Sequence, residues 1–312
     1  MADSSITSVG IDFGGTSVKL GVCRGGELLC TDTPIITADF VGPAALITEM
    51  AARVAKLKET YPDIAAIGVG VPGLVDFDHG FVHVLTNVPG WKHVPLKAIL
   101  SEKTGLPVVV ENDANAMAYA EYRYGAGRGL NNVVALTMGT GIGGGLILNG
   151  QLYRGSGCAA GEIGQMSIDS DGKAGHYGNL GALEKYTGNK EIAEHAVLRY
   201  AEAHITKTLE ECTPKKIAEA AQAGDDIARQ IWEEIADWLG TALSSIAWLL
   251  NPDAFVIGGG VAQAGDLVFG PLKRKVQSML NSVVWERLQI LPARYSNEAG
   301  IIGNAALAAD LV

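Results

Sequence analysis

The sequence predicts an α/β protein made of two duplicated domains with a central cleft between them. Apolar β-branched runs alternate with segments of helical spacing, a pattern typical of strands joined by helical crossovers. A set of glycine-punctuated hairpins near the start of the chain occurs again near its middle. The chain has 312 residues, which exceeds the length at which a single hydrophobic core usually divides in two.

The first third of the chain begins as a meander of strands and continues as alternating strands and helices. Glycine turns separate the first apolar runs, so we expect three strands at residues 8–14, 17–24 and 27–35. We then expect a helix, a strand, a helix and a strand at residues 43–59, 64–71, 95–104 and 107–111. The change from short strands separated by glycine turns to alternating helices and strands predicts parallel crossovers after an antiparallel start.

The same order begins again in the second third. Strands are expected at residues 132–139 and 145–149, with a turn at Gly150. The run Asp12-Phe-Gly-Gly-Thr16 aligns with Thr137-Met-Gly-Thr-Gly141. Two copies indicate duplicated domains rather than a solenoid, although two glycine hairpins can also be alike by chance.

Helical spacing dominates the last third, and the chain closes with an apolar helix from Ala299. We expect helices over residues 190–251 and strands at residues 254–257 and 286–293. A wholly apolar helix needs a sheet to cover, and the first domain supplies one. We therefore predict an N-terminal domain of residues 1–112 plus 298–312 and a C-terminal domain of residues 113–297.

Composition limits the class of partner. The net charge is −10 and the chain has no long run of lysine or arginine, which makes nucleic acid and anionic membrane surfaces poor partners. The four cysteines form no Cys-x-x-Cys pair, as expected of reduced thiols. The start of the chain lacks a signal-peptide pattern, and no apolar stretch reaches the ~18 residues of a membrane helix. We expect a soluble, cytoplasmic protein, with a homodimer as the base-rate oligomer.

The first motif with chemical meaning is Asp12-Phe-Gly-Gly-Thr16, at the tip of an expected hairpin. Glycines let backbone N–H groups approach phosphate oxygens closely, and Thr16 adds a hydroxyl. Asp12 offers a hard oxygen to Mg²⁺, either directly or through water. The motif is not a Walker A loop, which needs Gly-Lys-Ser/Thr at the start of a helix. An ordinary tight turn is the alternative interpretation.

Two further glycine runs follow apolar strands. Gly139-Thr-Gly-Ile-Gly-Gly-Gly145 precedes a strand instead of a helix, which excludes a Rossmann dinucleotide site. If this glycine run faces the first hairpin, the two would hold a triphosphate between them. Gly258-Gly-Gly260 lies between a strand and a helix, where it either flanks an adenosine or only caps the strand.

Polar residues at the end of a valine-rich strand form the run Glu111-Asn-Asp-Ala-Asn115. Ligands of α/β sheets bind at the carboxyl ends of strands. Asp113 is suited to accept the proton of a hydroxyl that attacks phosphorus, and Asn112 to recognise hydroxyl groups. The alternative is that Asp113 only caps the following helix.

Together, the motifs resemble the ROK family (repressors, open reading frames, kinases) of the actin-like ATPase superfamily. The resemblance covers the chain in order and rests on Gly10-Ile-Asp-Phe-Gly-Gly-Thr-Ser-Val-Lys19, Gly68-Val-Gly-Val-Pro-Gly73, Glu111-Asn-Asp-Ala-Asn-Ala116, Met138-Gly-Thr-Gly-Ile-Gly-Gly-Gly145, Gly161-Glu-Ile-Gly164 and Gly258-Gly-Gly-Val261. It implies two actin-like, ribonuclease H-like ATPase domains that close over ATP and Mg²⁺.

The resemblance also implies roles for individual residues. Asp113 would be the catalytic base and Asp12 would serve Mg²⁺. The residues expected at the sugar are Gly73, Asn87, Asn112, Glu162, Gln165 and Glu184. The residues expected at the nucleotide are Gly14, Gly15, Thr16, Lys19, Thr137, Gly139, Thr140, Gly141, Gly258, Gly259 and Gly260.

The sequence departs from the family at the zinc site that most members carry. Gln165 stands in place of the histidine that follows Gly-Glu-Ile-Gly, and the run Gly175-His-Tyr-Gly-Asn-Leu-Gly-Ala182 has none of the three usual cysteines. Tetrahedral zinc needs four nitrogen or sulfur ligands, and His176 alone cannot supply them. We therefore predict that the chain binds no zinc.

As a function, the resemblance implies transfer of the γ-phosphoryl group of ATP to the 6-hydroxyl of a hexose, with glucose as the first candidate. N-acetylhexosamine, mannose, fructose and allose are alternative substrates. Polyphosphate is an alternative donor, because the branch of the family that uses it also lacks the zinc cysteines. A non-enzymatic sugar-sensing regulator is a different class of function. It is disfavoured because only seven residues precede the first expected strand, too few for a DNA-binding helix-turn-helix.

Overall fold

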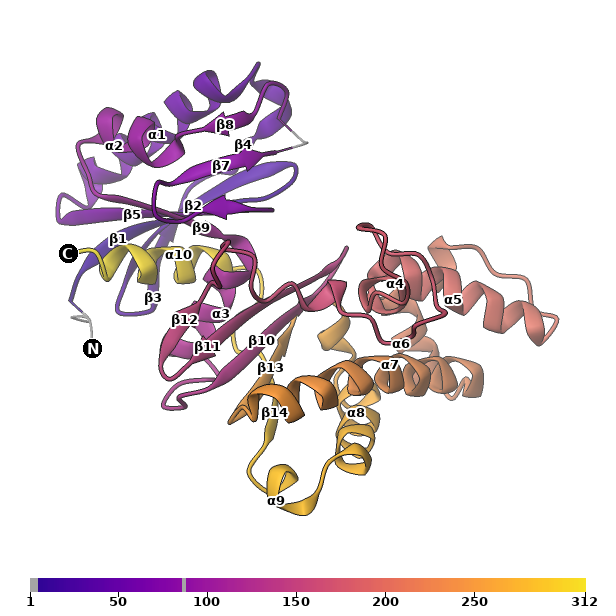
Figure 1. The fold of residues 1–312 in the computed structure, drawn as a ribbon. Coiled ribbons are helices and arrows are strands. Elements are labelled where there is room, and N and C mark those ends of the chain that lie inside the picture. The colour runs from indigo at the N-terminus through magenta and orange to yellow at the C-terminus, as the bar shows by residue number, and fades with distance from the viewer. Residues whose placement is uncertain (1–4, 86–87) are drawn as a thin grey trace.

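The molecule contains two large mixed β-sheets in separate lobes, with two helices between them (Figure 1). It is a computed structural model that describes residues 5–85 and 88–312. The helices between the lobes are α3 (Asp113–Tyr124) and α10 (Ala299–Ala309).

The first sheet has the strand order β3-β2-β1-β5-β9, and the short strand β4 pairs with β2. Its strands are β1 (Thr7–Phe13), β2 (Ser17–Arg24), β3 (Glu27–Thr31), β4 (Ile35–Ile36), β5 (Ile64–Val71) and β9 (Val108–Asn112). The hairpin strands β1, β2 and β3 are antiparallel, whereas β1, β5 and β9 run parallel.

The second sheet repeats this arrangement with the order β12-β11-β10-β13-β14. Its strands are β10 (Val133–Met138), β11 (Ile142–Leu148), β12 (Gln151–Tyr153), β13 (Ala254–Gly258) and β14 (Gln289–Pro292). Again the first three strands along the chain are antiparallel, and β10, β13 and β14 are parallel. The matching orders confirm the predicted α/β class with two duplicated units.

Helices cover both faces of each sheet. The first sheet has α1 (Pro43–Thr60) and α2 (Leu96–Thr104) on one face and α10 on the other (Figure 1). The second sheet has α3 on one face. Its other face packs on a helical layer with the elements α4 (Glu184–Thr187), α5 (Asn189–Glu202), α6 (Pro214–Gln222), α7 (Asp226–Leu250), α8 (Asp266–Met279) and α9 (Ser282–Trp285).

Alternate residues of a strand face opposite sides of a sheet, and β10 shows this clearly. Val134 and Leu136 pack into the helical layer of the second lobe, whereas Val133 and Ala135 pack against the helices between the lobes. All four side chains are fully buried. A strand that is apolar on both faces is typical of parallel sheets covered by helices, as the sequence predicted.

Close glycine contacts hold α10 against its neighbours. A Cβ atom at Gly68 of β5 would lie 1.9 Å from the Asn304 carbonyl oxygen, and one at Gly303 would lie 1.8 Å from the Ala116 carbonyl oxygen. Only glycine permits these approaches to backbone. The C-terminal helix therefore returns to the first sheet and packs on α3, while the exact division into two domains stays a prediction.

The structure differs from the sequence prediction in several places. The third expected strand is divided into β3 and β4, with Pro34 between them. A small sheet not predicted from the sequence contains β6 (Val75–Asp76), β7 (Phe81–Val84) and β8 (Lys92–Val94). The last strand begins at Gln289 instead of residue 286, because a turn that follows α9 occupies residues 286–287.

Four short 3₁₀ helices complete the described elements, and they are η1 (Thr37–Asp39), η2 (Ile163–Gln165), η3 (Glu210–Cys212) and η4 (Val261–Ala264). Within the described part of the chain, no helix is both long and apolar enough to cross a membrane.

Candidate active site

The carboxyl ends of the parallel strands of both sheets open onto one region. In the first sheet, Asp12 lies near the end of β1 and Asn112 ends β9. In the second, Thr137 of β10 pairs with Gly258 at the end of β13. The turns after parallel strands are the usual ligand-binding positions of α/β sheets. Here two such edges contribute to the same set of cavities.

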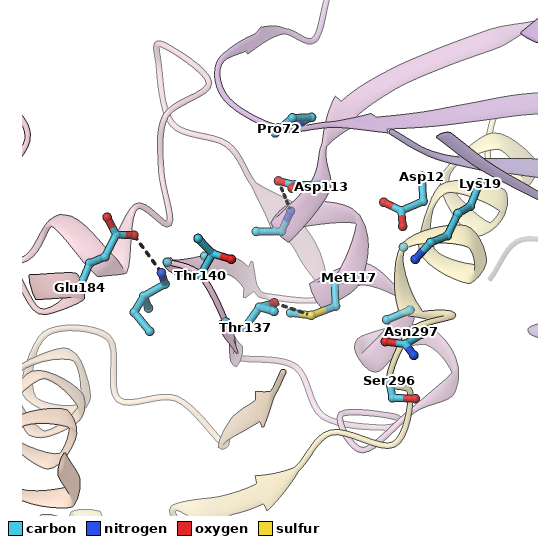
Figure 2. A pocket seen from close by; sticks show the side chains of 17 residues that line it. Asp12, Lys19, Pro72, Asp113, Met117, Thr137, Thr140, Glu184, Ser296 and Asn297 are labelled. Atoms are coloured by element: carbon cyan, nitrogen blue, oxygen red, sulfur yellow. Dashed lines mark hydrogen bonds between the residues drawn. The ribbon is translucent and has the colours of Figure 1, made fainter. Parts of the chain in front are cut away.

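Three neighbouring cavities lie along this region, and each shares residues with the next. The central cavity measures about 560 Å³ and is lined from both lobes, by Asp12 and Lys19 on one side and by Thr137 and Thr140 on the other (Figure 2). A cavity of about 510 Å³, here called the Glu162 cavity, shares three lining residues with it. A third cavity of about 400 Å³, here called the Gly259 cavity, shares four. The sequence predicted one cleft, and the structure shows three connected compartments.

Asp113 lines both the central cavity and the Glu162 cavity. It is the first residue of α3, and its Oδ1 atom accepts a hydrogen bond from the Ala114 N–H at 2.9 Å. Burial raises the pKa of Asp113 to about 6, and the nearby charges of Asp12 and Glu162 add to the effect, while the bond from Ala114 opposes it. A carboxylate with this pKa is ionised at neutral pH yet basic enough to take a proton.

The helix cap is Asn112 and not Asp113. The Asn112 Oδ1 atom accepts hydrogen bonds from the N–H groups of Ala114 and Asn115, at 2.9 and 3.1 Å. Its Nδ2 atom donates to the Gly73 carbonyl oxygen at 3.1 Å. Asn112 therefore caps the helix, and the Asp113 carboxylate faces the cavities. Capping is thus not the sole role of Asp113.

Asp12 and Lys19 lie opposite each other on β1 and β2 and both line the central cavity. Burial raises the pKa of Asp12, and the Lys19 charge opposes that rise. Among the described residues, nothing donates a hydrogen bond to the Asp12 carboxylate. A half-buried carboxylate that faces a cavity and accepts no hydrogen bond from the described residues fits a site for Mg²⁺ or its bound water.

The two predicted phosphate hairpins differ in their placement. Gly139, Thr140 and Gly141 line the central cavity, and the Gly139 N–H closes a tight turn on the Gly141 carbonyl oxygen at 2.9 Å. The first hairpin closes similarly, from the Gly14 N–H to the Ser17 carbonyl oxygen at 2.9 Å. Its tip residues Gly14, Gly15 and Thr16 line none of the three cavities. Their contact with phosphate stays a prediction.

The last three glycines of the run that ends at Gly145 have a structural explanation. Residues 143–145 lie inside β11, which begins earlier than the sequence predicted. A Cβ atom at Gly145 would lie 2.5 Å from the Ala118 Cβ, and one at Gly144 would lie 2.5 Å from the Gly161 carbonyl oxygen. These glycines let α3 and the segment before η2 approach the strand closely, so β11 is glycine-rich for reasons of packing.

The Glu162 cavity contains four of the residues expected at the sugar, and these are Gly73, Asn112, Glu162 and Gln165. Glu184, by contrast, lines the central cavity, and its Oε2 atom accepts a hydrogen bond from the Ile142 N–H at 2.9 Å (Figure 2). Burial and the Glu184 charge raise the pKa of Glu162. Asn87 lies outside the described residues.

Comparison with known sequences identifies the family of this chain. The model of the ROK family matches residues 8–311. The chain belongs to the ROK family. It is 35% identical to a glucokinase of Halalkalibacterium halodurans, over 95% of this chain and 92% of the relative. It is 34% identical to a glucokinase of Streptomyces coelicolor, over 97% of this chain and 98% of the relative.

A solved structure of the family has the same architecture. A ROK glucokinase from Streptomyces griseus, crystallised with glucose and AMPPNP, superposes with a TM-score of 0.79. The two chains are 35% identical, and the match covers 97% of this chain and 99% of the other. The fold of duplicated actin-like domains is thus the fold of the ROK family. The roles of individual residues rest on the geometry above.

Hydrogen bonds hold the segment in which the sequence lacks the expected zinc ligands. The Asn179 Nδ2 atom donates to the Gln165 carbonyl oxygen at 2.8 Å, and the Leu183 N–H donates to the Met166 carbonyl oxygen at 2.9 Å. No cluster of three or more metal-binding side chains occurs in residues 5–85 and 88–312. That the chain binds no zinc stays a prediction from its residue types.

The Gly259 cavity includes the predicted Gly258, Gly259 and Gly260, together with residues that sequence reasoning missed. Ser296 and Asn297 line both this cavity and the central one, as does Met117 of α3. Ser296 and Asn297 lie between β14 and α10, at the carboxyl end of a parallel strand. The rule that pointed to Asp113 could therefore have found them.

Proposed function

We propose that this ROK protein is an ATP-dependent glucose kinase that transfers the γ-phosphoryl group to the 6-hydroxyl. The placement of Asp113 carries the proposal, because its carboxylate borders two of the three connected cavities. A sugar in the Glu162 cavity and a triphosphate in the central cavity would therefore meet at this residue. The glucose and AMPPNP bound by the Streptomyces griseus relative support the choice of substrates.

The proposal gives each part of the reaction its own compartment, and the lining residues support this division. In the Glu162 cavity, Glu162, Gln165 and Asn112 offer polar groups to sugar hydroxyls. In the central cavity, Gly139, Thr140 and Lys19 offer a backbone amide turn, a hydroxyl and a cation to phosphate oxygens. The glycines of the Gly259 cavity would lie beside the adenosine.

In this mechanism, the Asp113 carboxylate accepts the proton of the 6-hydroxyl as its oxygen attacks the γ-phosphorus. The bond from the γ-phosphorus to the β,γ-bridging oxygen breaks in line, and ADP leaves with that oxygen. Mg²⁺ bound with ATP would neutralise charge on the phosphate oxygens, and Asp12 would hold it. Lys19 lies on the same side of the cavity and supplies a fixed positive charge.

The proposal is tested by measuring sugar phosphate formation from each of a panel of hexoses, with ATP and with polyphosphate as donor. We expect glucose and ATP to give the highest kcat/KM, well above the rate of ATP hydrolysis without sugar. A preference for N-acetylhexosamine, mannose, fructose or allose would correct the substrate, and a preference for polyphosphate would correct the donor. If no sugar stimulates phosphoryl transfer, the kinase proposal is wrong. Homodimer formation and a cytoplasmic location stay predictions from the sequence.

A further inference from the structure

Glu121 is a fully buried carboxylate that lies away from Asp113, near the other end of α3. It accepts three backbone hydrogen bonds. Its Oε2 atom accepts from the N–H groups of Ala126 and Arg294, at 2.8 and 3.1 Å. Its Oε1 atom accepts from the Tyr295 N–H at 2.7 Å. Among the described residues no cation pairs with it, so backbone amides alone compensate its burial.

Glu121 lies on the same side of α3 as two residues that line the cavities. Asp113, Met117 and Glu121 are spaced four residues apart on α3 and so lie along one side of the helix. Met117 borders both the central cavity and the Gly259 cavity. Figure 2 shows Ser296 and Asn297 beside Met117 in the cavity wall, and these two residues follow directly after the pair whose amides Glu121 binds.

The segment before α10 has a second anchor on α3. The Arg294 guanidinium donates to the Tyr124 carbonyl oxygen at 3.0 Å, and the Tyr295 hydroxyl lies 3.4 Å from the same oxygen. Tyr295 itself lines the Gly259 cavity. Residues 294 and 295 thus attach this segment to α3, and residues 295–297 form part of the cavity wall.

We propose that Glu121 is a positioning residue for the nucleotide, which it serves by fixing the wall that contains Ser296 and Asn297. The inference rests on the proposed function, because it assumes that ATP occupies the central and Gly259 cavities. Glu121 lines none of the three cavities, and it acts only through the backbone of residues 294 and 295.

A carboxylate is required at this position because it accepts at both oxygens and donates at neither. Replacing Glu121 with glutamine would turn one acceptor into a donor that faces at least one N–H group. The fit is also tight, because a Cβ atom at Gly125 would lie 2.1 Å from the Glu121 Oε2 atom. Glu121→Gln therefore leaves a buried amide without a partner and displaces the wall.

Asp253 provides a matched control for a purely structural role. Its Oδ2 atom accepts hydrogen bonds from the N–H groups of Asn131 and Asn132, at 2.9 and 2.8 Å. These residues line none of the three cavities. Asp253→Asn therefore removes the charge from the same kind of carboxylate-to-backbone contact at residues that line none of the cavities.

The test is calorimetric titration of the wild type, Glu121→Gln and Asp253→Asn with AMPPNP and, separately, with glucose. We expect Glu121→Gln to bind AMPPNP about ten-fold more weakly, the effect of about one lost hydrogen bond, and to bind glucose within about two-fold of the wild type. Asp253→Asn should bind both ligands as the wild type does. Glu121→Asp, which keeps the charge, should recover part of the lost nucleotide affinity.

Several outcomes would overturn the inference. Wild-type affinity for AMPPNP in folded Glu121→Gln, or an equal loss for glucose, would show that Glu121 has no specific link to the nucleotide. A wild type that binds glucose but not AMPPNP would instead contradict the proposed function. If Glu121→Gln does not fold, hydrogen exchange of the wild type decides the matter. The peptide that contains residues 294–297 must exchange more slowly with AMPPNP bound, and an unchanged rate rejects the inference.

Discussion

Three carboxylates around the cavities have raised pKa values, and burial is the first cause in each. Asp113 has the largest of these shifts, to about 6, while Asp12 and Glu162 are raised less. Because these groups also repel one another, a proton or a cation among them is stabilised. The arrangement suits a site that accepts one proton and binds a metal–nucleotide complex, which is the chemistry of phosphoryl transfer to a hydroxyl.

The pH dependence of kcat/KM follows from the raised pKa of Asp113. A base must be ionised to accept a proton, so kcat/KM should fall about ten-fold per pH unit below about pH 6. An unperturbed aspartate would move this limb to about pH 4. The measurement is kcat/KM for glucose between pH 4.5 and pH 8 at saturating ATP. A flat profile down to pH 5 would show that ionisation of Asp113 does not control the reaction.

At the residue scale, the sequence identified the polar residues of the site but not all of their structural roles. Asp12 and Asp113 lie in the central cavity as expected, because strand ends of one sheet meet at one edge. The Asn112 oxygen caps α3, a role not predicted from the sequence, while its recognition of hydroxyls stays a prediction. The choice between two adjacent cap residues depends on backbone angles, which a single sequence does not specify.

At the scale of elements, the junction of β9 and α3 is held by Glu111 and by an arginine from the other lobe. The Glu111 Oε1 atom accepts from the Asn112 N–H at 2.9 Å and from the Asn115 Nδ2 atom at 3.0 Å. Its Oε2 atom accepts from the Arg154 Nε atom at 2.7 Å. The Arg154 guanidinium also stacks on Phe77, 3.5 Å from the ring centre. The turn that presents Asp113 is therefore fixed from both lobes.

Removing Arg154 should destabilise the protein much more than removing one partner of an exposed ion pair. Arg154→Ala would leave Glu111, whose side chain is 3% exposed, as a buried charge without its partner, and we expect the free energy of unfolding to fall by about 3 kcal/mol. Arg24→Ala is the control, because Arg24 and Asp63 are about half exposed and their ion pair should contribute much less. Urea unfolding measures both. Equal decreases in the free energy of unfolding would show that the ion pair across the lobes stabilises the protein no more than the exposed pair does.

Sequence patterns identified most elements but misplaced the start of β11. The glycines of residues 143–145 indicated a phosphate loop, whereas they lie in a strand that α3 approaches closely. Glycine serves close approach to a ligand and to a neighbouring helix equally well, so the sequence alone does not distinguish the two. The small sheet of β6, β7 and β8 was missed because two of its three strands have only two or three residues.

At the scale of the whole molecule, the two lobes present their strand ends to the same cavities but do not bring every predicted group to them. Gly14, Gly15 and Thr16 line none of the three cavities. If these residues hold phosphate, the first lobe must move towards the second when the ligands bind. Closure of this kind also excludes water, which would otherwise compete with the sugar for the phosphoryl group.

Ligand binding should therefore make the molecule more compact. We expect small-angle X-ray scattering to show a smaller radius of gyration with glucose and AMPPNP together than without ligands. The change should be larger than with either ligand alone, because each contacts both lobes. An identical radius of gyration in all four states would mean that the lobes are fixed, and the phosphate role of the first hairpin would then have to be abandoned.

The duplication of the two sheets could be predicted from the repeated hairpin, because duplication leaves the same glycine turns in each half. The interface of α3 with α10 could not, since it depends on close backbone contacts such as the one at Gly303. Such contacts become visible only when distant parts of the chain are placed together.

The turnover of Asp113→Asn tests the central claim most directly. Asparagine keeps the shape of the side chain and its bond from Ala114 but cannot take a proton at neutral pH. We predict that kcat for glucose falls at least about 100-fold while the dissociation constant for glucose stays within about three-fold. A variant that turns over at near the wild-type rate would contradict the assignment of Asp113 as the base.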